Sequence, residues 1–286
     1  MYVSNILARK KGVKYMHYSL RFEWLGMVFD ISTVLMILVT SLVVLLLCIG
    51  MTRNLTSATP SGAQNVMEWI VDFVTGITKS YISPKKAAGF VSLALTLFLY
   101  IFLGNQLGLV FNVNTAHHNG PDHQVSEKVK DLLTASTTPE AKQQKMAKLE
   151  EELNSNDPHS HGVVIGWWKS PTATPSVTFA LAFIVLLYAH YLGIKKSFGG
   201  WLKHTFLNPI HILEEFIIKP LTLPLRLFGN IFAGEVLIAF LLGVGIFGSI
   251  PLFLWLGYSV FVGSVQAFIF TTLAMVYLSQ QVNEDH

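Results

Sequence analysis

A few polar side chains interrupt the most apolar part of this sequence, and their types suit proton chemistry. Between residues 220 and 283 the charged residues are Arg226 and Glu235, and the amides Asn230 and Gln266 lie in the same stretch. A guanidinium keeps its charge in every protein environment, so an arginine in hydrocarbon needs a compensating partner. A carboxyl group in hydrocarbon can take up a proton, because burial favours its neutral form. This combination predicts a site that moves protons or ions.

Helical spacing limits which of these groups can meet. Asn230 follows Arg226 by four residues and therefore shares its helix face. Glu235 follows Arg226 by nine residues, about 900° of rotation and about 13 Å along the axis, so it points to the opposite face. If the chain folds back near Ser249, Gln266 comes within about 9 Å of Arg226 on the neighbouring helix. Arg226 and Glu235 are therefore predicted to serve different surroundings.

Each of the two charged groups has more than one interpretation. The partner of Arg226 is either Glu214 or Glu215, at the entrance to the apolar stretch, or a carboxylate of another protein. Alternatively, Arg226 lies near the start of its helix and extends its charged head to the membrane surface. Glu235 either relays a proton or ion, or stays protonated and hydrogen-bonded to a serine or threonine.

The cysteine and the histidines give little support to metal or redox chemistry. Cys48 is the single cysteine, so a disulfide framework and a four-cysteine metal site are excluded. Histidine pairs can bind zinc, but their spacing fits no standard ligand set, and we expect no metal and no cofactor. The histidines near the ends of the polar segment are His117, His118, His123, His159 and His161. His190 marks either a membrane boundary or the water end of a proton path.

Composition predicts the elements that must position these groups. Hydrophobic residues make up 52% of the chain and charged residues 13%, about half the charged share of a soluble domain. Charges are absent from 31–50, 87–121 and 177–194, which are long enough to span a bilayer. We therefore predict an all-α multi-pass membrane protein with about five membrane helices, plus interfacial amphipathic helices. A net charge of +3 without a basic stripe argues against nucleic-acid binding.

The last two membrane helices are predicted to form a long, strongly tilted hairpin. A helix of about 27 residues reaches roughly 40 Å against a hydrocarbon core of about 30 Å, which implies a tilt of about 40°. Ser249 can cap the second helix of this hairpin, and Pro251 can occupy its first turn. The predicted division is a tail at 1–30, a first span at 31–50, a loop with an amphipathic interfacial helix at 51–86, a second span at 87–113, an aqueous insert and connector at 114–176, a third span at 177–196, an interfacial segment at 197–219 and the hairpin at 220–286.

Two long motifs of the hairpin resemble subunit a of the F-type ATP synthase, in its bacterial form. They are PLRLFGNIFAGE at 224–235 and SVQAFIFTTLAMVYLS at 264–279. FDISTVLMILVTSLVV at 29–44, FLGNQLG at 102–108 and KPLTLPLRLFGN at 219–230 resemble the same family. The resemblance covers most of the chain apart from 1–25 and 114–170.

The resemblance implies the stator subunit of a proton-driven rotary motor, which is not an enzyme by itself. In that family the arginine matched by Arg226 faces the carboxylates of a rotating c-ring, between two aqueous half-channels. Asn230, Glu235 and Gln266 match further proton-path positions of the family, and Glu235 matches the acid on the high-proton side. The implied partners are the c-ring, the peripheral-stalk b subunits, the lipid bilayer and the translocated protons.

The chain departs from the family pattern at three places. Ser259 stands where members often have a histidine that pairs with the half-channel acid, and Gly108 stands where some members have an acid. Residues 114–162 are longer than the family needs. Other groups are therefore expected to help line the half-channels, and the candidates are Asp30, Asn105, His190, Glu215 and Ser259.

The resemblance also implies a location in the bacterial cell membrane, with the N-terminus outside and the C-terminus in the cytoplasm. Lysines and arginines do not follow the positive-inside rule in that orientation. A start at Met16 would remove four basic residues from the outer side, and we expect Met16 to be the native start. The alternative functions are a self-contained proton- or sodium-coupled secondary transporter, for which no internal repeat is visible, and a membrane scaffold without an ion path.

Overall fold

A computed structural model describes residues 17–56, 59, 62–110, 114–117, 127–153, 163–207 and 209–283 of the chain. The chain divides into two compact units. The mixed unit comprises residues 1–36 and 111–169, and the helical unit comprises residues 37–110 and 170–286. Met16 and four of the five histidines noted in the polar segment lie outside the described residues, namely His118, His123, His159 and His161.

Five of the described helices are long and apolar enough to cross a membrane, which confirms the predicted fold class. The first three are α2 (Ile31–Thr52), α5 (Val91–Val110) and α8 (Pro175–Lys196). The fourth covers Pro209–Ile238 and the fifth covers Gly245–Val282. Many of their large apolar side chains are exposed, as expected where lipid rather than water surrounds a helix.

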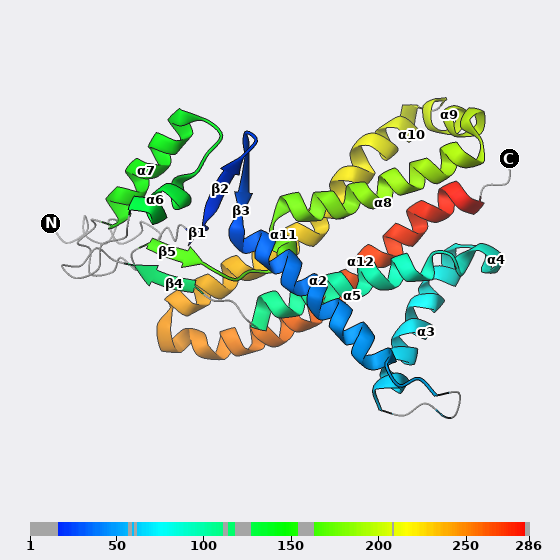
Figure 1. Cartoon of the computed structure of the whole chain (residues 1–286), viewed down its shortest axis with the longest axis horizontal. Helices are drawn as coiled ribbons and strands as arrows, with labels where there is room; N and C mark the ends of the chain where they lie inside the picture. The colour runs from blue at the N-terminus through cyan, green and yellow to red at the C-terminus, as the bar shows by residue number, and fades with distance from the viewer. Residues whose placement is uncertain are drawn as a thin grey trace. The chain divides into compact units, whose positions relative to one another are not determined.

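The long helix α12 (Ser249–Asn283) packs against several other helices of the helical unit. It contacts α5, α8 and α11 (Lys219–Gly243), and α11 also contacts α8 (Figure 1). Their shared core combines small and large apolar side chains, and small residues let membrane helices approach closely. Its members include Ala94, Leu97, Ala182, Val185, Leu223, Leu227, Ala267, Phe270, Ala274 and Leu278.

The amphipathic helix expected within residues 51–86 is α3 (Ala63–Tyr81), which packs against α5 and α12. The short helix α4 (Pro84–Ala87) follows α3 and precedes α5. After α8 the chain forms α9 (Phe198–Phe206), whose N-cap Ser197 accepts a hydrogen bond from the Gly200 amide.

The helix that carries Arg226 begins earlier than expected from the apolar run alone. α10 (Pro209–Leu213), the π-helical turn η2 (Glu214–Ile218) and α11 follow one another without a break. Pro224 lies inside α11 and does not end it. The turn η3 (Gly245–Gly248) then leads into α12, which begins at the predicted cap and has Pro251 in its first turn.

The mixed unit contains short strands that the apolar pattern did not predict. β1 (His17–Tyr18) pairs in parallel with β5 (Val163–Gly166), which pairs antiparallel with β4 (Asn114–His117). The helices α6 (Glu127–Thr134) and α7 (Pro139–Leu153) pack against each other. The core of this unit consists of Tyr18, Leu133, Leu149, Leu153 and Ile165.

A second pair of strands lies directly before the first membrane helix. β2 (Arg21–Trp24) and β3 (Met27–Asp30) form an antiparallel hairpin with a two-residue turn. The segment 1–30 was expected only as a tail, so this hairpin is a finding of the structure. The missed signal is the alternation of aromatic and charged residues over Arg21–Trp24, which is typical of a strand.

Candidate functional site

Arg226 lies near the middle of the fourth membrane helix. It follows Pro209 by 17 residues and precedes Ile238 by 12, about 25 Å and about 18 Å along the axis. Its side chain is exposed, and among the described residues it has no hydrogen bond and no ion pair. This distance from both helix ends argues against an arginine that reaches the membrane surface. The structure therefore leaves a full positive charge on the exposed face of an apolar helix.

Glu214 and Glu215, the intrachain partners considered for Arg226, pair with Lys219 instead. Lys219 Nζ lies 2.5 Å from Glu215 Oε1 and 3.4 Å from Glu214 Oε1. Lys219 Nζ also donates to Gln280 Oε1 of α12 at 2.6 Å. The side chains of Lys219 and Glu215 are 4% and 5% exposed, so their ion pair is buried. We call Lys219, Glu214, Glu215 and Gln280 the Lys219 cluster.

Lys219 was not among the residues expected to act, although part of its environment is visible in the sequence. Glu215 precedes Lys219 by four residues, a spacing at which helical side chains meet. The turn η2 (Glu214–Ile218), which ends directly before Lys219, is π-helical, a geometry that occurs frequently at functional sites. Gln280 follows Lys219 by 61 residues, and this contact depends on how α11 packs against α12.

His190 and Glu215, two separately predicted candidates, come together across α8 and η2. His190 Nε2 lies 3.7 Å from Glu215 Oε2. Trp201 Nε1 donates to His190 Nδ1 at 3.2 Å. Because an indole nitrogen can only donate, Nδ1 accepts, and the neutral ring carries its proton on Nε2, which faces the carboxylate. The ring also stacks on Phe216, with centroids 5.9 Å apart. This arrangement orients a proton donor toward a buried acceptor.

Tyr277 of α12 connects the Lys219 cluster with the surroundings of Arg226. The Lys219 ammonium lies over the Tyr277 ring, 5.2 Å from its centroid. Tyr277 also lies within electrostatic range of the Arg226 charge. Polar groups therefore extend from His190 through the Lys219 cluster to Tyr277 and toward Arg226.

Asn105 of α5 is buried, and both ends of its amide are used within the helical unit. Asn105 Nδ2 donates to the Gly263 carbonyl of α12 at 2.9 Å. Asn105 Oδ1 accepts from Thr172 Oγ1 at 2.5 Å. Thr172 belongs to η1 (Pro171–Ala173), the turn that leads into α8. The amide thus joins three elements that are far apart in the sequence.

Gly108, three residues after Asn105, has no room for a side chain. A Cβ atom at position 108 would collide with the Cα and Cβ atoms of Ser170. An acidic residue at this position would therefore displace the segment before η1. This close approach is a physical reason for glycine at a position where the resemblance suggested an acid.

The other predicted groups lie on α11 and α12, which pack against each other. Asn230 and Glu235 are half-buried, and Gln266 is 9% exposed. The Ser259 hydroxyl is shielded from solvent and has no hydrogen-bond partner among the described residues. Buried hydroxyl groups are normally hydrogen-bonded, so Ser259 offers an unused donor and acceptor on α12.

Asp30 lies in the mixed unit, where it caps α2. Its carboxylate accepts from Lys169 Nζ at 2.7 Å, from Ser19 Oγ at 2.7 Å and from the Thr33 amide at 3.1 Å. Burial raises the pKa of Asp30, but the Lys169 charge and these hydrogen bonds outweigh it and hold the pKa below its ordinary value. Asp30 is therefore an ionised N-cap within a local ion pair.

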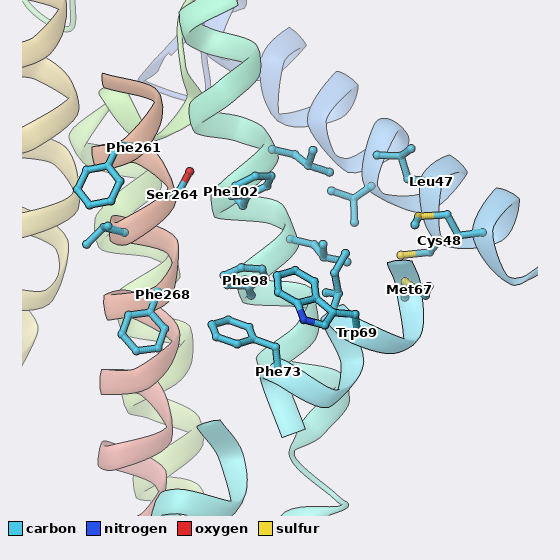
Figure 2. A pocket seen from close by; sticks show the side chains of 16 residues that line it. Leu47, Cys48, Met67, Trp69, Phe73, Phe98, Phe102, Phe261, Ser264 and Phe268 are labelled. Atoms are coloured by element: carbon cyan, nitrogen blue, oxygen red, sulfur yellow. The ribbon is translucent and has the colours of Figure 1, made fainter. Parts of the chain in front are cut away.

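A cavity of about 460 Å³ in the helical unit holds none of these polar candidates. It lies between α2, α3, α5 and α12, and Figure 2 shows Cys48, Trp69, Phe73 and Phe98 around it. Its wall is almost entirely apolar apart from Ser264, so it lacks the row of polar groups that a proton path needs. Within the described ranges, no three His, Cys, Asp or Glu side chains gather as metal ligands.

The fold and these groups define a class of protein: a multi-pass helical membrane protein with an exposed intramembrane arginine and a buried ion pair. A family model described as ATP synthase A chain matches residues 33–279.

Relatives named ATP synthase subunit a match nearly the whole chain. The relative from Priestia megaterium is 39% identical over 283 residues, covering 94% of this chain and 99% of its own. The relative from Bacillus subtilis strain 168 is 39% identical and covers 92% of this chain and 97% of its own. The relative from Listeria monocytogenes serotype 4b is 38% identical and covers 92% of this chain and 96% of its own. The chain belongs to the ATP synthase subunit a family.

Proposed function

We propose that this chain is the proton-translocating stator subunit of a bacterial F-type ATP synthase and is not catalytic by itself. Membership of the subunit a family supports a place in the membrane part of that complex. In this proposal two aqueous half-channels end on either side of Arg226, and the carboxylates of a rotating c-ring pass it. Proton flow through the half-channels turns the ring and drives ATP synthesis elsewhere in the complex.

The observation that carries the proposal is the unpaired charge of Arg226. A cation near the middle of a membrane helix costs about 2.5–3.5 kcal/mol even on the lenient insertion scale. Glu214 and Glu215, the acids of the chain considered as its partners, are engaged by Lys219, so they do not offset this cost. A carboxylate of another subunit at about 4 Å would contribute roughly 4 kcal/mol at an effective dielectric constant of 20.

The same electrostatics gives Arg226 its role in coupling. A ring carboxylate is attracted to the guanidinium only while it is deprotonated, because the neutral acid carries no charge. Arg226 therefore favours release of the proton before the carboxylate passes. Its fixed positive charge also opposes a direct proton jump between the half-channels.

The Lys219 cluster supports a path on one side of Arg226. His190 Nε2 faces Glu215 at 3.7 Å, and Lys219 joins that carboxylate to Gln280 and Tyr277. We assign this path to the proton that leaves the ring. The Lys219–Glu215 ion pair holds the polar side chains of the path in place between helices that are otherwise apolar.

Groups on the α11–α12 hairpin supply the path on the other side. Glu235 is the proton acceptor of the entry half-channel, and Asn230 and Gln266 line the approach to the ring. The Ser259 hydroxyl takes the place of the family's histidine as a hydrogen-bonding group. Asn105 is a positioning residue, because both ends of its amide hold α5, α12 and η1 together.

Asp30 shapes the mixed unit next to the first span rather than carrying protons itself, because Lys169, Ser19 and the Thr33 amide already bind its carboxylate. The partners in this proposal are the c-ring, the peripheral-stalk b subunits and the lipid bilayer. The chain resides in the bacterial cell membrane with its N-terminus outside and its C-terminus in the cytoplasm.

Proton pumping by the reconstituted complex tests the role of Arg226. We expect Arg226→Ala to abolish both ATP-driven acidification of vesicles and ATP synthesis driven by a proton gradient. Leu225→Ala is the matched control, because Leu225 is the adjacent exposed residue of the same helix and is apolar. Normal gradient-driven synthesis by an assembled Arg226→Ala complex would refute the proposal.

A further inference from the structure

The β2–β3 hairpin has one entirely apolar face. Phe22 pairs with Phe29 and Trp24 pairs with Met27, and alternation along each strand places these four side chains on the same side. The Phe22 and Phe29 rings stack with centroids 5.4 Å apart, and Trp24 lies 6.3 Å from Phe29. The opposite face carries the charged residues of the hairpin together with one valine. Its members are Arg21, Glu23, Val28 and Asp30.

The apolar face stays largely uncovered, although α6 packs against β2. Phe22 is 38% exposed, Met27 is 53% exposed and Trp24 is 62% exposed. Leu25, at the tip of the turn, is 77% exposed. An isolated two-stranded hairpin is marginally stable in water. An exposed apolar face of this kind usually marks a surface that binds a membrane or another molecule.

The turn itself is built with an unfavourable residue. Leu25 and Gly26 have φ values of 53° and 73°, the signature of a two-residue type I′ turn. Asn, Asp and Gly are the usual residues at the first of these positions, because a bulky side chain is strained at positive φ. A leucine there raises the conformational energy of the hairpin, so a benefit from its apolar side chain must offset the strain.

Backbone continuity places the hairpin at a membrane boundary. β3 ends at Asp30 and the first membrane helix begins at Ile31, whose amide donates to the Leu20 carbonyl at 2.9 Å. The Asp30 carboxylate binds both the Thr33 amide and Lys169, which ties the hairpin to the first turn of α2. The hairpin therefore cannot move far from the level at which α2 enters the bilayer.

We propose that the apolar face of the β2–β3 hairpin is a lipid-binding surface that inserts into the headgroup region of the leaflet where α2 begins. Tryptophan is enriched at this level of membranes, and an apolar face of a peripheral element typically enters by about 5–10 Å. The charges of the hairpin lie on its other face and at its base, so insertion buries none of them. The bilayer is the occupant favoured over a protein partner, because the hairpin leads without a break into a membrane helix whose first turns expose Val34 and Leu35.

Spin-label accessibility at two positions of the hairpin tests this surface in the assembled complex. In a Cys48→Ala background, Leu25→Cys and Glu23→Cys each carry a nitroxide, in vesicles of phosphatidylethanolamine and phosphatidylglycerol. We expect the label at 25 to collide several-fold more often with oxygen, which concentrates in lipid, than with a water-soluble nickel chelate. The label at 23, on the polar face, is expected to show the reverse.

A second variant separates insertion from simple folding of the hairpin. Leu25→Asn suits the type I′ turn and therefore cannot act by unfolding it. A label at Met27→Cys should gain several-fold access to the nickel chelate when this substitution is added. The proposal would be overturned if the chelate reached the label at 25 as readily as the label at 23. It would also be overturned if neither reagent reached the label at 25, because protein would then cover it. No proton transport is measured, so this result is independent of the role of Arg226.

Discussion

Replacing Lys219 with methionine should destabilise the helical unit strongly. Methionine keeps an unbranched side chain but cannot neutralise Glu215, whose side chain is 5% exposed. Removing one partner of a buried ion pair typically costs about 3–5 kcal/mol, which corresponds to roughly 150- to 5,000-fold in the folding equilibrium. Glu214 is 37% exposed and remains hydrated, so it adds little to this loss. We expect the whole effect to come from the stranded Glu215 carboxylate and the lost donor to Gln280.

The double variant Glu215→Gln with Lys219→Met provides the decisive comparison. Replacing both members of a buried ion pair with neutral groups is often nearly neutral for stability. The double variant should therefore be more stable than Lys219→Met alone, with a coupling energy of at least about 1.5 kcal/mol. Unfolding of the purified protein by SDS in mixed micelles, followed by near-ultraviolet circular dichroism, measures the free energies of unfolding of the wild type, Glu215→Gln, Lys219→Met and the double variant.

The matched control is Lys195→Met, because Lys195 is an exposed lysine at the end of α8. Its effect should stay within about 0.5 kcal/mol, as for most surface substitutions. Additivity of the Glu215 and Lys219 substitutions within about 0.5 kcal/mol would show that the two groups do not interact, and would refute the buried pair.

Two further predictions follow from close contacts elsewhere. Gly108→Ala should lower the free energy of unfolding by about 1–3 kcal/mol, because the added Cβ collides with Ser170. Gly76→Ala is the control, because the space around its Cβ is open, and it should be neutral or stabilising in the same unfolding assay. Equal effects of the two substitutions would contradict the packing argument. Because Lys169 holds the pKa of Asp30 below its ordinary value, their pair stabilises the mixed unit above about pH 4, and this contribution is lost as the pH falls further. Lys169→Met should therefore make the acid side of a circular-dichroism titration shallower, and an unchanged slope would contradict this.

The membrane helices could be predicted from the sequence because lipid imposes a simple rule. A spanning helix must satisfy its own backbone and present apolar side chains over about 20 residues, so residues 31–50 or 177–194 are recognisable without any partner. The resemblance to a known family also rests on contiguous motifs around Arg226 and Gln266. Such local patterns survive in a single sequence.

The short strands of the mixed unit could not be predicted with the same rule. β1 and β5 are 147 residues apart at the His17–Val164 pairing, so their contact leaves no local pattern. The β2–β3 hairpin has an alternating pattern, but Leu25 replaces the asparagine or glycine that usually marks such a turn. The hairpin was therefore missed because Leu25, which the structure shows at a strained positive φ, is not a residue that marks a turn.

The sequence by itself determined that an arginine lies in an apolar helix and that its charge must be compensated, because a guanidinium cannot lose its proton. It left the partner open between the chain's own acids and an acid elsewhere. Only the tertiary structure decided that Lys219 holds Glu214 and Glu215, and that Gln280 and His190 complete their surroundings. Ion pairing depends on which side chains are within a few ångströms, and across separate helices that distance is set by packing rather than by spacing along the chain.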